Sequence, residues 1–384
     1  MAKLGEVCTI VSGSTPKTSV TSYWDGNIKW ITPAELNEDT FYIMDSVRHI
    51  TEEGKEKTGL SYLPTGTVIL SSRAPIGKTA IAGCKMCCNQ GFKNLICSDA
   101  IYNEYLYFFL KSKTDYLNSL GRGATFKEIS KSIVESIEIP LPEVKQQKEI
   151  AEKFKKLEQL ISLRKQQLAK LDELIKAQFV EMFGDCKTNP KNWKTKALEK
   201  IANVGSSKRV FVEELQDNGI PFYRGTEIGA LAEKKAVIPA LFITEEHYKQ
   251  LCETTGKPQK GDLLMPSICP DGRIWIVDTD EPFYFKDGRV LWVHLTSANY
   301  NSVFLLYTLK DRIMTDYASI ASGTTFAELK IFALKKCKIF DVPLELQNQF
   351  ATFVEHVDQQ KQTVQQSLEK LELMKKALLQ EYFG

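Results

Sequence analysis

Cysteines are the residues of this chain whose spacing comes nearest to a metal site. Cys84, Cys87 and Cys88 lie close together and Cys97 follows them. A zinc site commonly takes its ligands as two close pairs. No second close pair of cysteines or histidines follows with finger spacing, and the second half of the chain has no equivalent. We therefore favour buried strand cysteines over zinc ligands.

The sequence contains no recognisable catalytic motif. The histidines are His49, His247, His294 and His356, and no two of them share a motif. The sequence has no Walker-type phosphate loop, no G-x-G-x-x-G after a strand and no Asn-Pro-Pro-aromatic methyltransferase motif. We expect a protein without enzymatic activity of its own, with no metal and no cofactor bound by this chain.

Composition limits the remaining classes. The 384 residues are 43% hydrophobic, which is enough for two domains of ordinary size. There is no run of about 18 apolar residues, so we expect no membrane span. Nine scattered cysteines in a long chain predict a reducing cytoplasm. A net charge of +2 is low for nucleic-acid binding, but charge can be segregated between faces.

An internal repeat organises the chain. Gly123–Ile129 returns as Gly323–Leu329, and at the same offset Glu181–Gly184 returns as Glu381–Gly384. The globular parts match more loosely, with an offset that drifts between pairs. This pattern indicates a duplication in which two domains do one kind of job on two different targets.

The globular halves have mixed α and β signals. Short strands are expected at Thr67–Ser71 and Lys78–Ala82. A hairpin is expected between Phe283–Phe285 and Val290–Val293, with Asp287-Gly288 as its turn. Two short apolar helices and two strands that end near a proline complete the pattern: Tyr102–Leu110, Val303–Leu309, Ile137–Pro140 and Lys338–Pro343.

Each half ends in a long amphipathic helix. Apolar residues alternate by 4 and 3, which is typical of a coiled-coil seam. The predicted helix-packing residues are Ile150, Phe154, Leu157, Ile161, Leu168 and Leu171 in the first helix, and Phe350, Val354, Val357, Val364, Leu368 and Leu371 in the second. Arg164 interrupts the first seam, and Lys361 and Lys375 interrupt the second. Because these interruptions are offset, we expect the two helices to pack on each other.

A polar linker joins the halves, and Gly184 before it suits a helix C-cap. A short linker after a long helix predicts antiparallel helices, a domain at each end and an approximate twofold axis. About 35 helical residues span roughly 50 Å, or roughly 15 base pairs of B-DNA. We predict an α+β fold with globular domains at 1–146 and 193–346, helices at 147–184 and 347–384, and a linker at 185–192.

Several motifs in this order resemble a known family. The carriers are Gly123-x-Thr125-Phe126, Ile139–Pro142 with Gln147 and Ile150, Glu181-x-Phe183-Gly184-Asp185, Asn189-Pro190-x-x-Trp193, Ser72–Gly77 and Asn89–Phe92. Together they make the whole chain similar to the specificity (S) subunits of type I restriction-modification systems.

The resemblance implies a function. Two target recognition domains would each read half of a bipartite, asymmetric sequence in double-stranded DNA. The long helices would set the spacer and dock two methyltransferase (M) subunits, which carry S-adenosylmethionine and methylate adenine at N6. Restriction (R) subunits, up to two, would add ATP-driven translocation and cleavage with Mg²⁺. The location implied is the cytoplasm of a prokaryote, at the nucleoid.

Two other functions stay open. One is a coiled-coil scaffold that binds protein only. The other is a recognition subunit that serves modification without restriction.

Candidate DNA contacts in the first domain combine the residue types that read bases and grip phosphate. Arginine suits guanine O6/N7, glutamine and asparagine suit adenine N6/N7, and lysine suits phosphate. The candidates are Arg73, Lys78, Gln90, Lys93 and Asn94, with Arg122 as a phosphate contact. A solvated loop is the alternative for each of them.

The second domain offers basic counterparts but departs from the family pattern. Its candidates are Lys208, Arg209, Arg224, Arg273 and Arg289. Pro266–Pro270 replaces the Ser72–Pro75 segment, and Lys286–Arg289 replaces Asn89–Phe92, so base contacts carry over less directly. For Phe126 and Phe326 we favour a structural role, docking each domain onto its helix.

Overall fold

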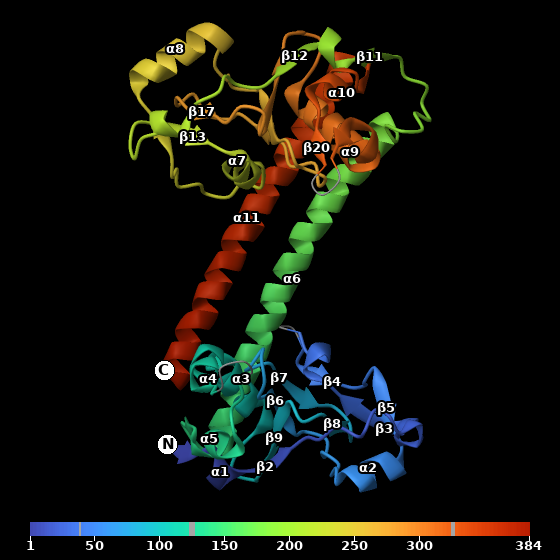
Figure 1. The fold of residues 1–384 in the computed structure, drawn as a ribbon, viewed down its shortest axis with the longest axis vertical. Coiled ribbons are helices and arrows are strands. Elements are labelled where there is room, and N and C mark those ends of the chain that lie inside the picture. The colour runs from blue at the N-terminus through green and yellow to red at the C-terminus, as the bar shows by residue number, and fades with distance from the viewer. Residues whose placement is uncertain (38–39, 123–126, 324–326) are drawn as a thin grey trace. The chain divides into compact units, whose positions relative to one another are not determined.

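The chain forms two compact units in a computed structural model that describes residues 1–37, 40–122, 127–323 and 327–384 (Figure 1). Unit 1 comprises Met1–Gln166 and Gln365–Gly384, and unit 2 comprises Gln167–Val364. Two helices of 40 residues, α6 (Val144–Phe183) and α11 (Leu344–Phe383), each contribute a segment to both units. None of the helices in the described ranges has the length and apolar composition that crossing a membrane requires.

The main sheet of unit 1 has five strands in the order β2-β9-β6-β7-β4. These strands are β2 (Cys8–Ser12), β4 (Tyr42–Ile43), β6 (Val68–Ser71), β7 (Thr79–Ala82) and β9 (Phe92–Cys97). All neighbours are antiparallel except β4 and β7, which are parallel. Strands β6 and β7 are buried on both faces, which explains their continuous apolar composition.

A smaller sheet, β5-β3-β8, and the ribbon β1-β10 complete the β structure described in unit 1. Their strands are β1 (Ala2–Lys3), β3 (Trp24–Ile31), β5 (Arg48–Ile50), β8 (Cys87–Cys88) and β10 (Glu138–Ile139). The helices are α1 (Leu4–Val7), α2 (Glu52–Thr58), α3 (Asn103–Ser112), α4 (Thr114–Leu120) and α5 (Lys131–Ser136), with 3-10 turns η1 (Thr21–Tyr23) and η2 (Pro33–Glu35). Helix α3 packs on β6 and β7, and its aromatic residues are buried there.

Unit 2 repeats this plan with a four-stranded main sheet, β12-β18-β15-β16, in which all neighbours are antiparallel. The smaller sheet is β14-β13-β17, and β11-β21 and β19-β20 are ribbons. The strands are β11 (Thr195–Ala197), β12 (Ala202–Gly205), β13 (Ile220–Tyr223), β14 (Phe242–Ile243), β15 (Leu263–Pro266), β16 (Trp275–Ile276), β17 (Tyr284–Phe285), β18 (Val290–Leu295), β19 (Ala321–Ser322), β20 (Glu328–Leu329) and β21 (Lys338–Phe340).

The helices of unit 2 outside the long pair are α7 (Gly225–Ala232), α8 (Glu245–Thr255), α9 (Ser302–Ile320) and α10 (Ile331–Lys335), with 3-10 turns η3 (Leu198–Lys200) and η4 (Val212–Glu214). The order β12-β18-β15-β16 matches β2-β9-β6-β7 of unit 1, where β4 adds a fifth strand, and β14-β13-β17 matches β5-β3-β8. Helices α8 and α9 follow the strands equivalent to those that α2 and α3 follow. The predicted α+β class and internal repeat are confirmed.

The predicted hairpin in the second half is wrong. Strand β17 pairs in parallel with β13, whereas β18 pairs with β12 and β15. The turn at Asp287-Gly288 is present, with Gly288 at φ +64°. Because the flanking strands belong to different sheets, the turn transfers the chain from one sheet to the next.

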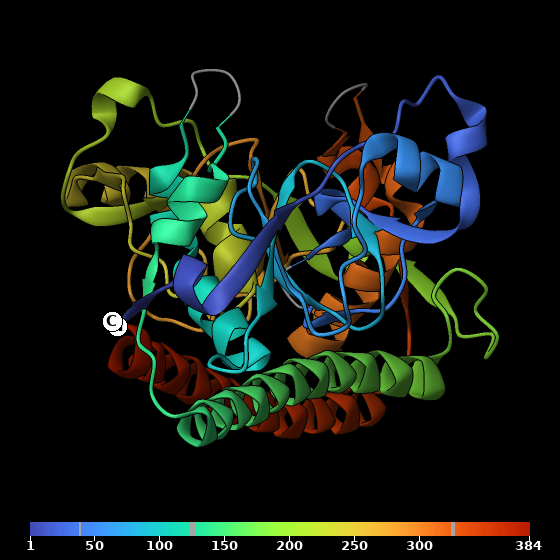
Figure 2. The ribbon, with the colours of Figure 1, turned by 90° about the horizontal axis from the view of Figure 1, so that it is seen from below.

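The seam residues of the long helices enter the cores of both units. All the predicted packing residues are buried except Leu168 and Leu371, which are half-buried. Helix α6 begins at Val144, before the expected 147, and ends at Phe183. In each unit, segments of both helices lie beside one another along one side of the globular part (Figure 2).

The helix segments are antiparallel within each unit. In unit 1, Phe154 stacks on Phe383, and Lys375 Nζ lies 2.7 Å from Glu158 Oε1. In unit 2, Phe183 packs edge-on against Phe350, and Lys361 Nζ lies 2.5 Å from Asp172 Oδ1. The lysines that interrupt the second seam are thus paired with carboxylates of the facing helix.

The end of α6 is closed by the segment that follows it. Gly184 adopts φ +85°, and its N–H donates to Val180 O at 2.8 Å. Lys191 Nζ and Trp193 Nε1 donate to the last helical carbonyls, those of Glu181 and Phe183, at 2.5 and 3.1 Å. The predicted linker is therefore a hydrogen-bonded cap.

Candidate nucleic-acid interface

One end of the main sheet has the same backbone hydrogen bonds in both units. In unit 1, Ser72 N donates to Gly91 O at 2.7 Å, and Ile129 N donates to Ser72 O at 2.9 Å. In unit 2, Ser267 N donates to Arg289 O at 2.9 Å, and Leu329 N donates to Ser267 O at 2.7 Å. Ser267 therefore occupies the position of Ser72.

These bonds also correct the sequence alignment of the two halves. Arg289 occupies the position of Gly91, so matching Lys286–Arg289 to Asn89–Phe92 is wrong by one residue. We call this end of the sheet the rim. The first rim comprises Thr15, Arg73, Gln90, Lys93, Arg122 and Glu128, and the second comprises Arg209, Arg224, Arg273, Asp287, Arg289 and Glu328.

The first rim is centred on the carboxylate of Glu128. Its two oxygens accept from Arg73 Nε at 2.9 Å and from Lys93 Nζ at 3.1 Å. The backbone of Glu128 also pairs with that of Arg122. Burial opposes ionisation of Glu128, but the hydrogen bonds from Arg73 and Lys93 outweigh it and lower the pKa. Two candidate cations, Arg73 and Lys93, thus share one ionised carboxylate, whereas Arg122 meets Glu128 through backbone atoms only. Lys93 is itself buried, so Arg73 is the exposed member of this cluster.

Gln90 and Lys78, two further predicted DNA contacts of the first domain, differ in whether their side chains are free to reach DNA. Gln90 is exposed and hydrogen-bonds Thr15 through its side-chain oxygen. Lys78 Nζ donates to the carbonyls of Pro33 and Leu36, at 3.2 and 2.7 Å. Its ammonium group is therefore hydrogen-bonded within unit 1 and is not free to reach DNA.

Asn94 cannot read DNA from its position. It is fully buried in β9, and its amide donates to Val11 O at 3.0 Å and to Cys88 Sγ at 2.9 Å. Strand β9 is buried on both faces at this point, so Asn94 faces the interior, which corrects the prediction that it contacts a base.

The second rim carries most of its cations as ion pairs. Arg289 Nη1 contacts Glu328 Oε1, and Arg209 Nε lies 3.3 Å from Asp287 Oδ2. Lys208 is exposed, and its backbone N donates to Tyr284 Oη at 3.2 Å. Because Asp287 and Arg289 flank Gly288, each of the two ion pairs has one member in the same turn.

Arg224 sits at the N-terminus of α7. Its guanidinium makes two hydrogen bonds to Glu227, at 2.7 and 3.2 Å. Burial opposes ionisation of Glu227, but hydrogen bonds from Arg224, Thr226 and the backbone lower its pKa to about 2. Arg273, which is half-buried, lies 2.7 Å from Asp271 Oδ2 and 3.8 Å from Glu233 Oε1.

Equivalent positions of the two rims hold different chemistry. When the strand register is extended, Thr15 corresponds to Arg209, Asn89 to Asp287 and Gln90 to Gly288. The neutral contact between Thr15 and Gln90 at the first rim is therefore replaced at the second by an ion pair between Arg209 and the residue before the glycine. Arginine, glutamine and lysine donors at such a rim can meet base edges and phosphates.

Sequence reasoning missed Glu128 and Glu328. The signal was present, because both glutamates lie in the repeated segment at the same offset. It also missed Arg48, which is exposed and lies 3.6 Å from the centre of the Trp24 ring. The predicted docking residues Phe126 and Phe326 lie outside the described residues.

The cysteines are distributed over separate elements. Cys87 and Cys88 form β8 in the smaller sheet, whereas Cys97 faces Cys8 across β2 and β9. Burial raises the pKa of Cys87 to about 11 and that of Cys88 to about 12. Within the described ranges, no three His, Cys, Asp or Glu side chains gather in a way that could hold a metal ion.

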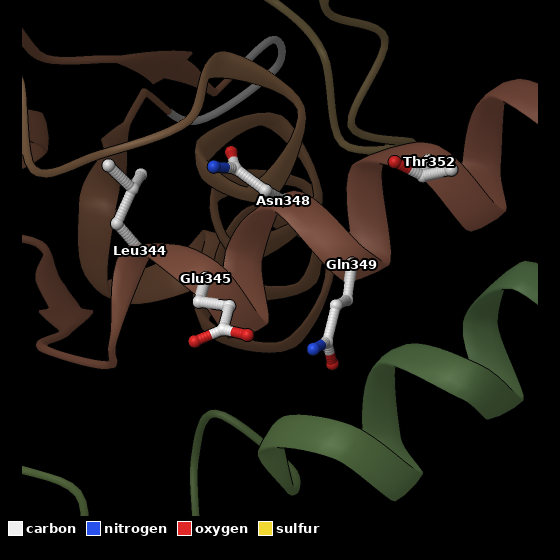
Figure 3. Close-up of a pocket in the computed structure, with 5 residues that line it drawn as sticks. All are labelled: Leu344, Glu345, Asn348, Gln349 and Thr352. Carbon is white, nitrogen blue, oxygen red and sulfur yellow. The ribbon is translucent and has the colours of Figure 1, made fainter.

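A shallow pocket on α11 is not a convincing site. It is lined by Leu344, Glu345, Asn348, Gln349 and Thr352, all from the first turns of one helix (Figure 3). Its single carboxylate, on Glu345, has no charged partner among these side chains. The rims remain the candidate interface.

The duplicated sheet domain matches a known class of proteins. The family model described as "Type I restriction modification DNA specificity domain" matches residues 1–173 and 190–373. The chain belongs to this family.

Named relatives agree with the family match. The type I restriction enzyme MjaIX specificity subunit of Methanocaldococcus jannaschii is 30% identical over 98% of this chain and 90% of its own length. The EcoR124I/EcoR124II specificity subunit of Escherichia coli is 25% identical over 46% of this chain and 45% of its own length.

Solved structures share the fold. The type I restriction-modification S subunit from M. genitalium matches with a TM-score of 0.56 and 16% identity, covering 100% of this chain and 95% of that one. A chain from a study of complex assembly and conformational transition of the type I R-M system matches with a TM-score of 0.63 and 18% identity, covering 100% and 96%.

Proposed function

We propose that this chain is the DNA-recognition subunit of a type I restriction-modification complex. Each unit reads one half of a bipartite target in double-stranded DNA, and the two halves are separated by an unread spacer. The chain itself is not the catalyst. The named relatives are specificity subunits, which supports this role.

The observation that carries the proposal is the comparison of the two rims. Their backbone hydrogen bonds are the same, yet the side chains at equivalent positions differ in charge and size. A shared framework with different donors favours two readers for two different short sequences. It also argues against a scaffold that binds only protein, because such a function would not require divergent polar rims.

The long helices supply a surface for partner subunits. Apolar side chains stand exposed on both helices: Leu160, Leu163 and Leu174 on α6, and Leu373 and Met374 on α11. Contiguous apolar surface marks interaction sites, and we propose that these side chains contribute to such a surface. We propose that two methyltransferase subunits dock here and bring S-adenosylmethionine. Restriction subunits, ATP and Mg²⁺ would join through them.

Binding by the chain purified with its methyltransferase partner tests this function. Methylome sequencing of cells with and without the gene identifies the methylated target. At physiological salt the complex should then bind this duplex about a thousandfold more tightly than a scrambled one. Equal affinity for both duplexes would contradict DNA recognition and favour the protein scaffold. Methylation without cleavage of unmodified target DNA would indicate modification without restriction.

The helix pair as a spacer makes a separate prediction. Inserting one heptad within Leu157–Leu171, with a matching heptad within Val357–Leu371, adds about 10 Å to each helix. The unread gap should grow by about three base pairs, and both half-sites should stay the same. Altered half-sites, or an unchanged gap, would contradict the spacer role.

A further inference from the structure

Glu128 and Glu328 occupy the same place in the backbone of their units. Glu128 pairs with Arg122 across a β-bridge, and Glu328 pairs with Ser322 in the β19-β20 ribbon. The N–H of the residue after each glutamate donates to a serine carbonyl, that of Ser72 at 2.9 Å in unit 1 and that of Ser267 at 2.7 Å in unit 2. Each carboxylate is therefore held at the rim by backbone bonds that do not depend on its own side chain.

Each carboxylate binds an arginine, but the two arginines come from different elements. Arg73 follows β6, whereas Arg289 precedes β18 and occupies the position that Gly91 has in unit 1. The position equivalent to Arg73 in unit 2 is Ile268. The glutamate thus lies at the same position in both units, whereas the arginine that pairs with it comes from a different element in each unit. Such convergence within one chain indicates that the pairing itself is useful.

The ion pairs leave part of each guanidinium available. Glu128 accepts from Nε of Arg73, and among the described residues no other side-chain partner is seen for its Nη1 and Nη2. Glu328 accepts from Nη1 of Arg289, and among the described residues no other side-chain partner is seen for its Nε and Nη2. Their side chains are 46% and 57% exposed. Each arginine therefore presents two adjacent N–H groups, the pattern that binds guanine O6 and N7.

The carboxylate also lowers the attraction of the arginine for phosphate. Each glutamate removes one charge from a cluster of two cations, since Lys93 also contacts Glu128 and Lys330 also contacts Glu328. The attraction for phosphate comes from net charge and is therefore reduced. Hydrogen bonds to a base edge depend on donor geometry, which the ion pair fixes in advance. An arginine that is already held by the glutamate also loses less conformational entropy when it binds DNA.

We propose that Glu128 and Glu328 are positioning residues for base recognition: Glu128 orients Arg73, and Glu328 orients Arg289, each toward a guanine in its own half of the target. The inference rests on the proposed function. It assigns a guanine contact to each half-site, and it assigns the specificity of that contact to a residue that does not touch the base.

Competition binding with variants of each unit tests the inference. The chain is purified with its methyltransferase partner, and each guanine of the target is replaced in turn by 7-deazaguanine, which lacks the N7 acceptor. The wild type should lose about tenfold or more in affinity at one guanine of each half-site, as expected for a bidentate contact. Glu128→Gln should abolish that penalty in one half-site only, and Glu328→Gln in the other only.

Further binding measurements distinguish a positioning role of the glutamate from a purely structural role. Glu128→Gln should bind nonspecific DNA more tightly and with a steeper salt dependence, because it removes a negative charge beside the exposed Arg73. Arg73→Lys should lose the same guanine discrimination, and adding Glu128→Gln to it should change little more. Glu135→Gln is the matched control in unit 1, since its ion pair with Lys131 lies on α5, away from the rim.

Two outcomes would overturn the inference while the proposed function stands. One is an unchanged 7-deazaguanine penalty in both glutamate variants. The other is an equal loss of affinity for all duplexes, accompanied by a lower Tm, which would show a purely structural role. A wild type that binds target and scrambled duplexes equally would instead refute the proposed function itself.

Discussion

Two buried glutamines join the globular parts to the long helices, and their replacement is a sharp test of the duplicated architecture. Gln147 Nε2 donates to the carbonyls of Ala100 and Pro142 at 3.0 and 2.8 Å, and its Oε1 accepts from Tyr102 N at 2.8 Å. The side chain is fully buried.

Gln347 repeats this arrangement in unit 2. Its amide donates to the carbonyls of Asn299 and Val342 at 3.1 and 2.9 Å, and its oxygen accepts from Asn301 N at 2.9 Å. The side chain is likewise fully buried. The same residue thus makes the same three bonds in both copies.

Substitution of either glutamine by leucine keeps the volume and removes all three bonds. The backbone N–H of Tyr102, or of Asn301, then loses its acceptor, at about 1–3 kcal/mol. The Ala100 and Asn299 carbonyls belong to exposed residues and can turn to water, so their loss costs less. The carbonyl of Pro142, or of Val342, also loses a donor, at about 1 kcal/mol. The apolar leucine returns about 1 kcal/mol. We expect a net loss of about 2 kcal/mol, or about 4–8 °C in Tm for a domain of this size.

Calorimetry of the full-length chain measures the effect. Gln147→Leu should lower the unfolding transition of unit 1, Gln347→Leu that of unit 2, and the two losses should add in the double variant because the sites share no partners. Gln146→Leu and Gln349→Leu are the matched controls, since both side chains are exposed on the same helices. A loss below about 0.5 kcal/mol in both buried variants, or a loss as large in the controls, would refute the reasoning.

Three other predictions follow from the described contacts. Lys375→Met should cost about 1 kcal/mol, because Glu158 loses one of its two partners and keeps Lys111 at 3.2 Å; urea titration measures it, and an unchanged midpoint would contradict it. The low pKa of Glu227 beside Arg224 contributes stability that is present above pH about 4.5 and declines as pH falls toward about 2. Glu227→Gln should therefore flatten the stability profile between pH 5 and 3, by about 1 kcal/mol, and parallel profiles would contradict this. EDTA should leave the Tm unchanged, since the described residues contain no metal-ligand cluster, and a drop of several degrees would reveal a structural ion.

Much of the architecture could be read from the sequence because it depends on periodicity. The 4-and-3 spacing of the seam directly reports which face of a helix is buried, and the buried seam residues follow it. The repeat at a constant offset identified the duplication, since Gln147 and Gln347 lie in the segments that match without a gap. These signals are local or simply repeated along the chain.

The errors arose where the answer depends on partners distant in sequence. The hairpin failed because a tight turn does not reveal which sheet each flanking strand will join. Asn94 and Lys78 have side chains suited to DNA, but their donors are used by Val11, Pro33 and Leu36 inside the unit. Composition describes what a side chain can bind, whereas the fold decides whether its donors are already occupied.

The sequence by itself determined the family, the two-fold repetition and the pair of long helices, because hydrophobic period and motif order are properties of the chain alone. Only the tertiary structure decided which cations form each rim and that Glu128 and Glu328 hold them. Arg73 and Arg289 reach equivalent carboxylates from different elements, and no alignment of the two halves would pair them. That convergence exists only in three dimensions, where strand register brings together residues that the chain keeps apart.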